Sequence, residues 1–425
     1  MGTSPLRRIG EGLRPSLVIR MTESDIHTTD NRPLSSTQET GATHVRAMLA
    51  ARPGTLALAA MSGGVDSAVA TALAARTGQS MLGVTMRLWS PGPGELSERV
   101  RQCCGPTAYE DARRAAAAAG IPHYVVNFEA AFERAVVDYF CGEYLAGRTP
   151  NPCVACNNLV KFGALLQFAD ALGAQTMVTG HYARVRHDAD GPHLLRAVDR
   201  RKDQSYMLAG LRREQLASLV MPLGTYTKEE TRALARELAI GVAEKPDSMD
   251  LCFVDGDYRG FILGRFPDAV RPGPVVTTDG REVGRHDGLL GYTVGQRKGI
   301  ANAGLGDGPW YVLRTERSRN AVVIGRREQL ARDVIACSAA NVIQPSALQG
   351  DELRGRAVCR YRSMPIPATA RVEEDGWLTV RLTEPVSVAS PGQLLVLYDA
   401  RDEEVLASGI IEQEDATVGR SAAYS

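Results

Sequence analysis

Two cysteine-containing segments carry the residues best suited to chemistry in this 425-residue chain. The first is Asn151–Asn157, which contains Cys153 and Cys156, and the second is Asp250–Phe253, which contains Cys252. Transfer of sulfur requires one thiolate that can carry a persulfide and a second thiol that can resolve it. Two cysteines that are distant in sequence but close to one pocket would meet this requirement.

The same cysteines allow a second interpretation, in which they bind a metal. Cys153 and Cys156 have the spacing of half a zinc site, and Cys252 would complete three ligands of an iron–sulfur cluster with one open position. Thiol chemistry is the favoured interpretation, and no metal site is predicted. Eight cysteines are too few for a disulfide scaffold. The remaining ones are predicted to be structural: Cys103, Cys104, Cys141, Cys337 and Cys359.

The strongest single motif is the glycine-containing loop Ser62–Ser67, which follows an apolar run and opens a helical pattern. Adjacent glycines let the backbone approach a phosphate closely, and the N–H groups at a helix start face an anion. Ser62 and Ser67 can add hydroxyl donors, and Asp66 can bind magnesium or orient the nucleotide. The alternative is an ordinary turn in which Asp66 caps the helix. The loop lacks the lysine of a Walker A motif and resembles the PP-loop of the ATP pyrophosphatases, which cleave ATP between the α and β phosphates.

The elements that would position these residues alternate between strands and helices. Expected strands cover Leu56–Met61, Met81–Trp89, Tyr124–Phe128 and Thr176–Thr179, and expected helices cover Val65–Arg76, Tyr109–Ala119 and Phe162–Leu172. This alternation predicts an α/β fold with a mainly parallel sheet that is covered by helices on both faces. Such sheets bind ligands at the carboxyl ends of their strands.

Glycine and proline become frequent beyond about residue 260, and helical patterns fade. A hairpin signal appears where Ala370–Val372 and Leu378–Leu382 alternate across a turn at Asp375-Gly376. Further strands are expected at Leu394–Tyr398 and Val405–Ile411, and a small barrel would remove the sheet edges. The predicted organisation is a disordered extension (1–50), an ATP-binding catalytic domain (51–260), a small β-rich central domain (261–332) and a C-terminal β-barrel (333–425).

The overall charge neither indicates nor excludes a nucleic-acid partner. Lys plus Arg and Asp plus Glu each number 49, and a neutral chain can still carry a local basic face. No apolar run reaches the roughly 18 residues of a membrane span, so no membrane association is predicted. Residues 1–20 contain four arginines, a weak transit-peptide feature. The expected location is the cytoplasm, with the mitochondrial matrix as the alternative.

The longer motifs make the chain similar to the tRNA-specific 2-thiouridylase family, over about residues 55–415. The matching stretches are Met61–Ser67, Cys103–Cys104 with Glu110–Arg113, Asn151–Phe162, Thr179–Ala183, Lys202–Tyr206, Asp250–Phe253, Gly291–Gly299, Pro309–Val312 and Arg360–Arg362. The resemblance implies a PP-loop α/β domain, a β-rich central domain and a barrel that binds tRNA. It also implies the use of ATP and Mg²⁺, tRNA as a partner, and a protein that donates persulfide sulfur.

The resemblance assigns roles to individual residues. Cys252 matches the persulfide carrier and Cys156 the second catalytic cysteine. The ATP-binding positions are Ala60, Met61, Ser62, Gly63, Gly64, Val65, Asp66, Ser67, Met86 and Gly180. The segment that meets the target base is Asn151, Pro152 and Cys153. The tRNA-contacting positions are His181, Lys202, Asp203, Gln204, Tyr361, Arg362 and Gln393.

The implied reaction replaces the 2-oxygen of the wobble uridine, position 34, with sulfur. Adenylation of the oxygen makes AMP the leaving group, and the persulfide sulfur then attacks C2. Cys156 next attacks the bridging sulfur and leaves a Cys156–Cys252 disulfide, or it frees hydrogen sulfide that attacks instead. The base must leave its stack, which costs less in an anticodon loop than in a duplex.

Three other functions fit parts of the sequence. One is an iron–sulfur-dependent PP-loop tRNA sulfurtransferase that acts on another nucleoside. Another is an RNA-binding protein with a vestigial nucleotide fold. The third, a PP-loop ligase that amidates a small metabolite, would need neither the cysteine segments nor the barrel.

Overall fold

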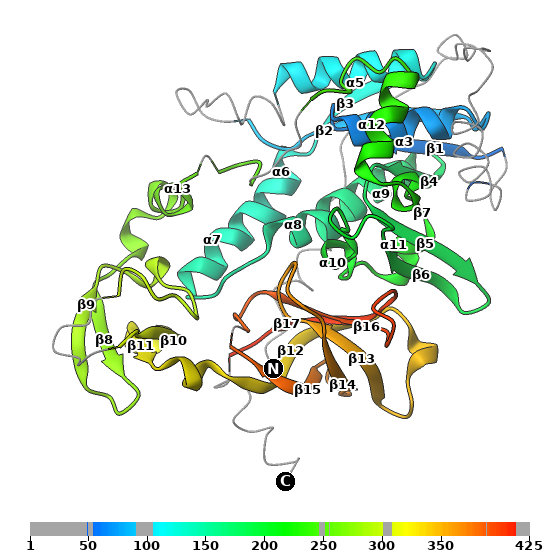
Figure 1. The fold of residues 1–425 in the computed structure, drawn as a ribbon. Coiled ribbons are helices and arrows are strands. Elements are labelled where there is room, and N and C mark those ends of the chain that lie inside the picture. Colours follow the sequence, from blue (N-terminus) through cyan, green and yellow to red (C-terminus); the bar gives the residue numbers. More distant parts are fainter. Residues whose placement is uncertain are drawn as a thin grey trace. The chain divides into compact units, whose positions relative to one another are not determined.

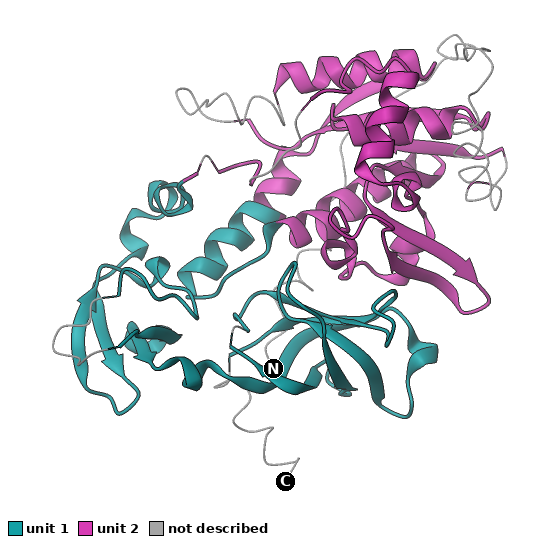
Figure 2. Cartoon of the chain, in the orientation of Figure 1, with its two compact units in different colours: residues 1–4, 136–152, 257–425 teal, residues 5–135, 153–256 magenta. Residues whose placement is uncertain are grey.

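The computed structural model describes Leu49 and residues 54–90, 105–245, 251–254, 256–300, 308–387 and 389–413 (Figure 1). The predictions for residues 1–48, for Cys103 and Cys104, and for Asp250 lie outside these residues. The described chain forms two compact units (Figure 2). The loop unit comprises the described residues up to Ala135 together with Cys153–Gly256, and the barrel unit comprises Val136–Pro152 together with the described residues from Asp257 onward. The predicted domain boundaries stay predictions.

The loop unit is built on a five-stranded parallel sheet in the order β3-β2-β1-β4-β7. Its strands are β1 (Leu56–Ala60), β2 (Met81–Arg87), β3 (His123–Asn127), β4 (Ala174–Thr179) and β7 (Leu219–Val220). The parallel α/β fold expected from the sequence is therefore confirmed. The chain runs outward from β1 in one direction and from β4 in the other, so the ends of these two strands flank the switch point at which such sheets bind ligands.

Small side chains let helices pack closely on this sheet. Ala57 and Ala59 of β1 share a buried cluster with helices α3 (Val65–Ala75), α5 (Pro106–Ala118) and α12 (Lys228–Glu237). Helix α9 (Leu165–Ala171) packs against β4. Shorter helices of the unit include α6 (Glu129–Phe132), α10 (Ser205–Leu208) and α11 (Arg213–Ala217).

One continuous helical segment leads from the predicted cysteine motif to β4. It begins as α8 (Pro152–Ala155), with proline at the position where its missing N–H costs nothing. It continues as a π-helix, η3 (Cys156–Ala164), and ends as α9. The helix predicted at Phe162–Leu172 thus starts ten residues earlier, at Pro152. A second π-helical stretch, η2 (Glu133–Val137), joins α6 to α7 (Asp138–Leu145).

A two-stranded hairpin that the sequence analysis did not predict follows β4. It pairs β5 (Ala183–Asp188) with β6 (Gly191–Arg196), and Gly191 at the turn has a φ of 101°. The Asp190-Gly191 dipeptide was the available hairpin signal.

The barrel unit contains a small sheet and a closed barrel. The sheet has the order β10-β11-β8-β9, from β8 (Gly273–Thr277), β9 (Glu282–His286), β10 (Tyr311–Glu316) and β11 (Ala321–Gly325), and it follows helix α13 (Tyr258–Arg265). The six barrel strands are β12 (Arg332–Val342), β13 (Glu352–Val358), β14 (Ile366–Val372), β15 (Leu378–Val386), β16 (Leu394–Tyr398) and β17 (Val405–Ile411). The predicted β-rich region, barrel and hairpin at Gly376 are confirmed.

Within the described residues, no helix combines the length and apolarity required to span a membrane.

Candidate active site

The glycine loop lies between the end of β1 and the start of α3, as predicted. Ala60 ends the strand, and Met61 is held next to β2 by a hydrogen bond of 2.9 Å from its N–H to the Val84 carbonyl. The Ser67 hydroxyl closes the loop because it accepts from the Ser62 N–H at 3.1 Å and donates to the Gly64 carbonyl at 3.1 Å.

The N-cap residue of α3 is Gly64, and no side chain caps the helix there. The N–H groups at the start of the helix therefore receive no hydrogen bond from an N-cap side chain. The 11-residue helix directs the positive end of its dipole to this point. Val65 and Ser67 are buried in its first turn, whereas Ser62 is exposed. The loop is therefore suited to a phosphate group.

Two glycines allow the close approach of backbone that this loop requires. Gly63 has a φ of 71°, in the region that favours glycine, and a Cβ there would collide with the Ala108 carbonyl. Gly180 follows β4, and a Cβ on it would lie 2.6 Å from the Asp66 carbonyl carbon and the Ser67 nitrogen. The residues present thus fit the role of a nucleotide cradle. Met86, another predicted ATP-binding position, lies near the end of β2 and is half-buried.

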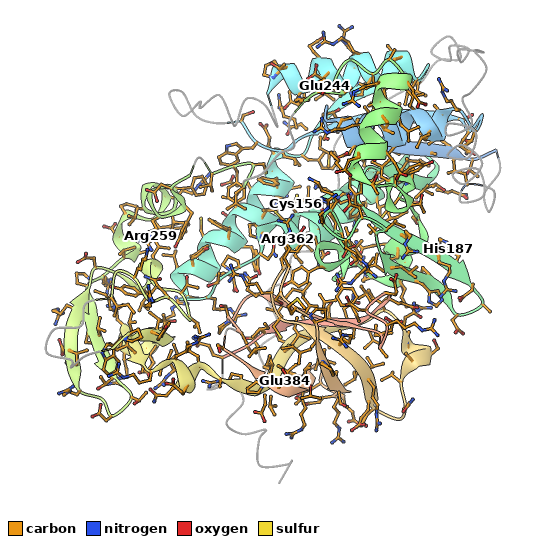
Figure 3. The ribbon with its side chains drawn as sticks, viewed as in Figure 1. Cys156, His187, Glu244, Arg259, Arg362 and Glu384 are labelled. Carbon is orange, nitrogen blue, oxygen red and sulfur yellow. The ribbon has the colours of Figure 1, made fainter. Side chains whose placement is uncertain are left out.

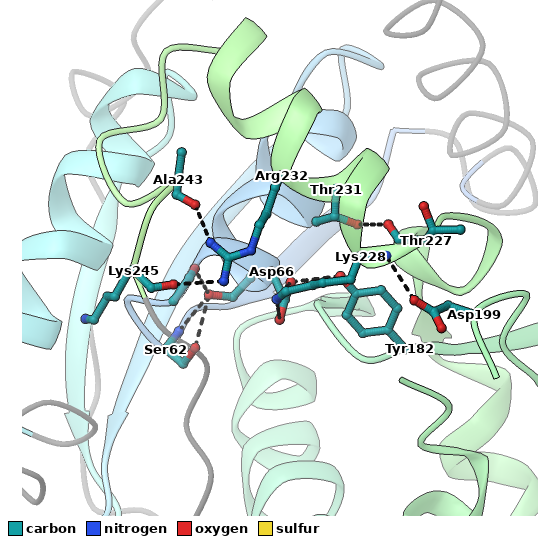
Figure 4. A network of polar contacts seen from close by, with 12 residues as sticks. Ser62, Asp66, Tyr182, Asp199, Thr227, Lys228, Thr231, Arg232, Ala243 and Lys245 are labelled. Atoms are coloured by element: carbon teal, nitrogen blue, oxygen red, sulfur yellow. Dashed lines mark hydrogen bonds and ion pairs between the residues drawn. The ribbon is translucent and has the colours of Figure 1, made fainter. Parts of the chain in front are cut away.

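Asp66 forms an ion pair rather than a helix cap (Figure 4). Lys228 Nζ lies 2.7 and 2.8 Å from its two carboxylate oxygens, and the Tyr182 hydroxyl donates to Oδ1 at 2.9 Å. The Lys228 side chain is 8% exposed and that of Asp66 is 32% exposed, so the pair is only partly screened by water. These contacts fix the carboxylate beside the loop.

A second lysine supports the loop from the other side. Lys245 Nζ donates to the Gly63 carbonyl at 3.1 Å and to Asp111 Oδ2 at 2.9 Å. Burial disfavours the charge on Asp111, but the bonds from Lys245 and Arg114 outweigh it and lower the pKa of the carboxyl group. Lys228 and Lys245 were not identified from the sequence. The only signal for Lys228 was its place after Thr227, which forms a capping box.

The predicted cysteine pair lies on the helix that begins at Pro152. Cys156 is buried and its thiol pKa is raised to about 12, chiefly by that burial, while the charge of Lys161 acts in the opposite direction. Cys153 is classed as exposed, but desolvation by the surrounding protein also raises the pKa of its thiol. The charge of Lys161 again acts in the opposite direction. Pro152, the first residue of this helix, is buried, and Asn151 before it is half-buried.

Cys252, from a distant part of the chain, acts electrostatically on Cys153 and Cys156. Its neighbour Phe253 is buried, with its ring centroid 5.5 Å from that of Phe132 and 6.4 Å from that of Trp89. Negative charge on Cys252 raises the pKa of both Cys153 and Cys156. The three thiols of the two predicted segments thus share one electrostatic environment inside the loop unit.

His181 connects the thiol region to the nucleotide loop. Its ring centroid lies 5.3 Å from that of Phe162 on the cysteine helix, and its Nδ1 is 2.7 Å from Thr179 Oγ1. Burial and the charge of Lys161 lower its pKa to about 3, so the ring is neutral at physiological pH. His181 therefore packs on the helix that carries Cys156, and the adjacent Gly180 packs on the glycine loop.

Asp203 and Gln204, which are expected to contact tRNA, form several hydrogen bonds within the loop unit. Asp203 is buried and accepts from Arg196 Nη1, the Ala197 N–H, and the Ser205 N–H and hydroxyl at 2.8–3.2 Å. Gln204 pairs with the backbone of Tyr182 through its side chain and its own N–H. Lys202 is half-buried beside them. Asp203 and Gln204 thus brace the turn after Gly180.

The remaining tRNA candidates lie in the barrel unit. Tyr361 and Arg362 occupy the connection between β13 and β14, where Arg362 is exposed, has a φ of 63° and stacks its guanidinium 5.1 Å from the Tyr361 ring centroid. Figure 3 labels Arg362 on this connection. Gln393 is half-buried at the start of β16. Among the described residues, no group of three or more His, Cys, Asp or Glu side chains is arranged to hold a metal ion.

Comparison with known proteins gives consistent matches along the chain. Residues 56–256 match the tRNA methyl transferase HUP domain, residues 259–326 the tRNA methyl transferase PRC-barrel domain, and residues 332–411 the aminomethyltransferase β-barrel domain. The tRNA-specific 2-thiouridylase MnmA of Carboxydothermus hydrogenoformans is 44% identical over 360 residues, which cover 84% of this chain and 97% of the relative. The proteins of the same name from Moorella thermoacetica and Chloroflexus aggregans are each 44% identical, over 84% and 80% of this chain and 99% and 94% of their own lengths. The chain therefore belongs to the tRNA-specific 2-thiouridylase family.

Proposed function

We propose that this protein is an ATP-dependent sulfurtransferase that converts the wobble uridine of tRNA, position 34, to 2-thiouridine. The observation that carries the proposal is the presence of Cys156, Cys252 and the glycine loop in one unit. His181 packs on Phe162 of the helix that carries Cys156, and the adjacent Gly180 packs on the loop. Family membership supports the same activity, because the matched relatives are tRNA-specific 2-thiouridylases.

The loop unit supplies the nucleotide chemistry. The uncapped start of α3 and the Ser62 and Ser67 hydroxyls bind the phosphates of ATP, and Mg²⁺ would neutralise part of their charge. Asp66 is held by Lys228 and Tyr182 and orients the loop. The uridine 2-oxygen attacks the α phosphorus, pyrophosphate leaves, and the adenylated base then has AMP as its leaving group.

The cysteines supply the sulfur. The terminal sulfur of a Cys252 persulfide attacks C2 and expels AMP, and the Cys156 thiolate then attacks Sγ of Cys252. This step releases thiouridine and leaves a Cys156–Cys252 disulfide, which an external thiol must reduce before the next turnover. Cys156 can alternatively attack the persulfide first and release hydrosulfide as the nucleophile. A persulfide-donating protein reloads Cys252, and the cytoplasm is the proposed location.

Burial keeps Cys156 protonated at neutral pH in this structure, since its thiol pKa is about 12. The nearby Lys161 favours the thiolate and opposes the burial. The thiol therefore becomes a strong nucleophile only as its proton leaves during the attack, which protects it from oxidation between turnovers.

The proposal is tested by supplying ATP, Mg²⁺, a persulfide donor and unmodified tRNA, and measuring 2-thiouridine in the digested tRNA by mass spectrometry. Wild-type protein should form product and AMP, and Cys252→Ser and Cys156→Ser should form none. Cys359→Ser, which changes a buried barrel cysteine, is the control and should remain active. Product from Cys252→Ser would refute Cys252 as the sulfur carrier.

A further inference from the structure

The helix that carries Cys156 contains a long π-helical stretch, η3 (Cys156–Ala164). Most π-helices are single-turn bulges inside α-helices, and they are frequent at functional sites. This one covers nine residues and begins at Cys156 itself. Because the wider turn is not the default of the backbone, contacts from other elements must hold it.

Gln215, in the short helix α11, holds the middle of η3. Its side chain is buried, and its Nε2 donates to the Asn158 carbonyl at 3.2 Å and to the Phe162 carbonyl. Its Oε1 accepts from the Arg212 N–H at 2.8 Å, which fixes the orientation of the amide group. A carboxamide nitrogen carries two hydrogens, so both donors of Gln215 are used on η3.

The chain just before α11 contacts η3 at two further points. Helix α10 packs against it, and Asn157 Nδ2 donates to the Met207 carbonyl at 3.2 Å (Figure 1). The Asn158 side chain lies against Gly210, where a Cβ would collide with its Nδ2. Within η3, a Cβ at Gly163 would lie 3.1 Å from the Asn158 carbonyl oxygen, so glycine eases the approach of two residues five apart.

The π-helical register determines which side chain lies near the Cys156 thiol. In an α-helix about 3.6 residues complete a turn, so side chains five residues apart point about 140° away from each other. Bonding between residues five apart in a π-helix brings them closer to one face. Lys161 is five residues after Cys156, and its charge favours the Cys156 thiolate. A return to α-helical spacing would turn Lys161 away from the thiol.

The charged side chains of the elements around η3 bond elsewhere or are exposed. They are Glu129 of α6, which pairs with Arg87 at 3.1 Å, and Arg213 and Glu214 of α11, of which the first bonds the Asp190 carbonyl and the second is exposed. Helix α10 carries no charged residue. Besides Lys161, the groups whose charge acts on the Cys156 thiol are Cys153 and Cys252, and both oppose the thiolate.

We propose that Gln215 is a positioning residue for sulfur transfer, which holds the π-helical register of η3 and thereby keeps the ammonium group of Lys161 near the thiol of Cys156. All of the contacts that carry this inference lie within the loop unit. The inference deepens the proposed function and rests on it for the meaning of the thiolation rate.

Gln215→Met tests the inference, because it keeps the length of the side chain and removes its donors and its acceptor. Gln167→Met makes the same change at an exposed position of α9, on the same helical segment, and is the matched control. Each substitution is also combined with Lys161→Met. Two quantities are measured: the rate at which iodoacetamide alkylates Cys156 from pH 7 upward, followed by mass spectrometry, and the single-turnover rate of 2-thiouridine formation at saturating tRNA.

We expect Gln215→Met to slow the alkylation of Cys156 roughly tenfold relative to Gln167→Met at a given pH, because loss of a nearby cation moves thiolate formation to higher pH. The single-turnover rate should fall by a similar factor. In the Lys161→Met background, Gln215→Met should have almost no further effect, since the charge that it positions is already absent. Cooperative melting checks the fold, and Gln215→Asn, which is one methylene shorter, replaces Gln215→Met if that variant does not melt cooperatively.

Two results would overturn the inference. One is an alkylation rate in Gln215→Met that equals or exceeds the rate in Gln167→Met. The other is the same slowing with and without Lys161, which is the signature of a packing defect that does not act through this charge. Failure of the proposed function would look different, since wild-type protein would then form no 2-thiouridine while the alkylation of Cys156 would still report on the register of η3.

Discussion

Lys161 is the residue whose charge acts on both cysteines of the thiol-bearing helix and on His181. It lies in the π-helix five residues after Cys156. Because hydrogen bonds in a π-helix join residues five apart, the two residues lie on adjacent turns. We predict that Lys161→Met raises the already elevated pKa of Cys156. Alkylation of Cys156 and thiolation of tRNA should each slow by roughly tenfold at neutral pH.

The sign follows from the charge of the reactive form. The thiolate is negative, so loss of a nearby cation moves its formation to higher pH, and the alkylation profile should shift to the alkaline side. Lys161→Arg keeps the charge and should restore most of the rate. Equal profiles for wild type and Lys161→Met, measured by mass spectrometry from pH 7 upward, would contradict the prediction.

Lys228 neutralises Asp66 beside the nucleotide loop. Lys228→Met should leave a carboxylate that repels the phosphates of ATP, and it should raise the Kd for ATP about tenfold, equivalent to roughly 1.4 kcal/mol. The double variant Asp66→Asn with Lys228→Met removes the uncompensated charge and should recover part of the affinity. Isothermal titration calorimetry checks both values, and an affinity that is unchanged in Lys228→Met would rule out this role.

The sequence alone identified those candidate site residues that lie together in short motifs. The glycine loop and the two cysteine segments are recognisable because each motif combines its reactive groups within a few positions. The partners of Asp66 and Gly63 could not be identified in this way, because Lys228 and Lys245 are separated from them by 162 and 182 residues. Only the folded sheet brings these side chains together.

At the scale of elements, the contact between Gly180 and the loop connects the end of β4 to the start of α3. Gly180→Ala would place a methyl group 2.6 Å from backbone atoms of Asp66 and Ser67, and neither can move independently of its element. We predict a loss of about 1–3 kcal/mol in unfolding free energy and a weaker affinity for ATP.

Gly241→Ala is the matched control for that substitution, because a Cβ at Gly241 meets nothing within 4 Å. Urea denaturation should show a change in midpoint for Gly180→Ala and almost none for Gly241→Ala. If both variants have the midpoint of wild type, the strand end and the loop are not in the contact described here.

Apolar periodicity predicted most elements of the sheet and barrel, because strands and α-helices have characteristic spacings. It could not predict the π-helix Cys156–Ala164, since an extra residue per turn depends on tertiary contacts. Gln215 supplies such contacts, with Nε2 donating to the carbonyls of Asn158, at 3.2 Å, and of Phe162. The two-residue strand β7 was too short to carry a pattern.

For the whole molecule, the grouping of Val136–Pro152 with residues after Asp257 could not be foreseen. The helical pattern of α7 shows which residues are apolar but not which partner covers them. That partner becomes evident in the structure, where the Tyr144 ring stacks on Tyr258 at 4.7 Å and Arg148 bonds Glu412. Both units are therefore assembled from segments that are distant in sequence.

This organisation predicts two thermal transitions with separate responses. ATP at about 100 times its Kd should stabilise the loop unit by roughly 2.7 kcal/mol and leave the barrel transition unchanged. Arg148→Met should lower the barrel transition, because the carboxylates of Glu143 and Glu412 would lose a shared, largely buried cation. Differential scanning calorimetry of wild type and Arg148→Met, each with and without ATP, measures the four combinations. A single transition that responds to both changes would show that the two units unfold as one cooperative structure.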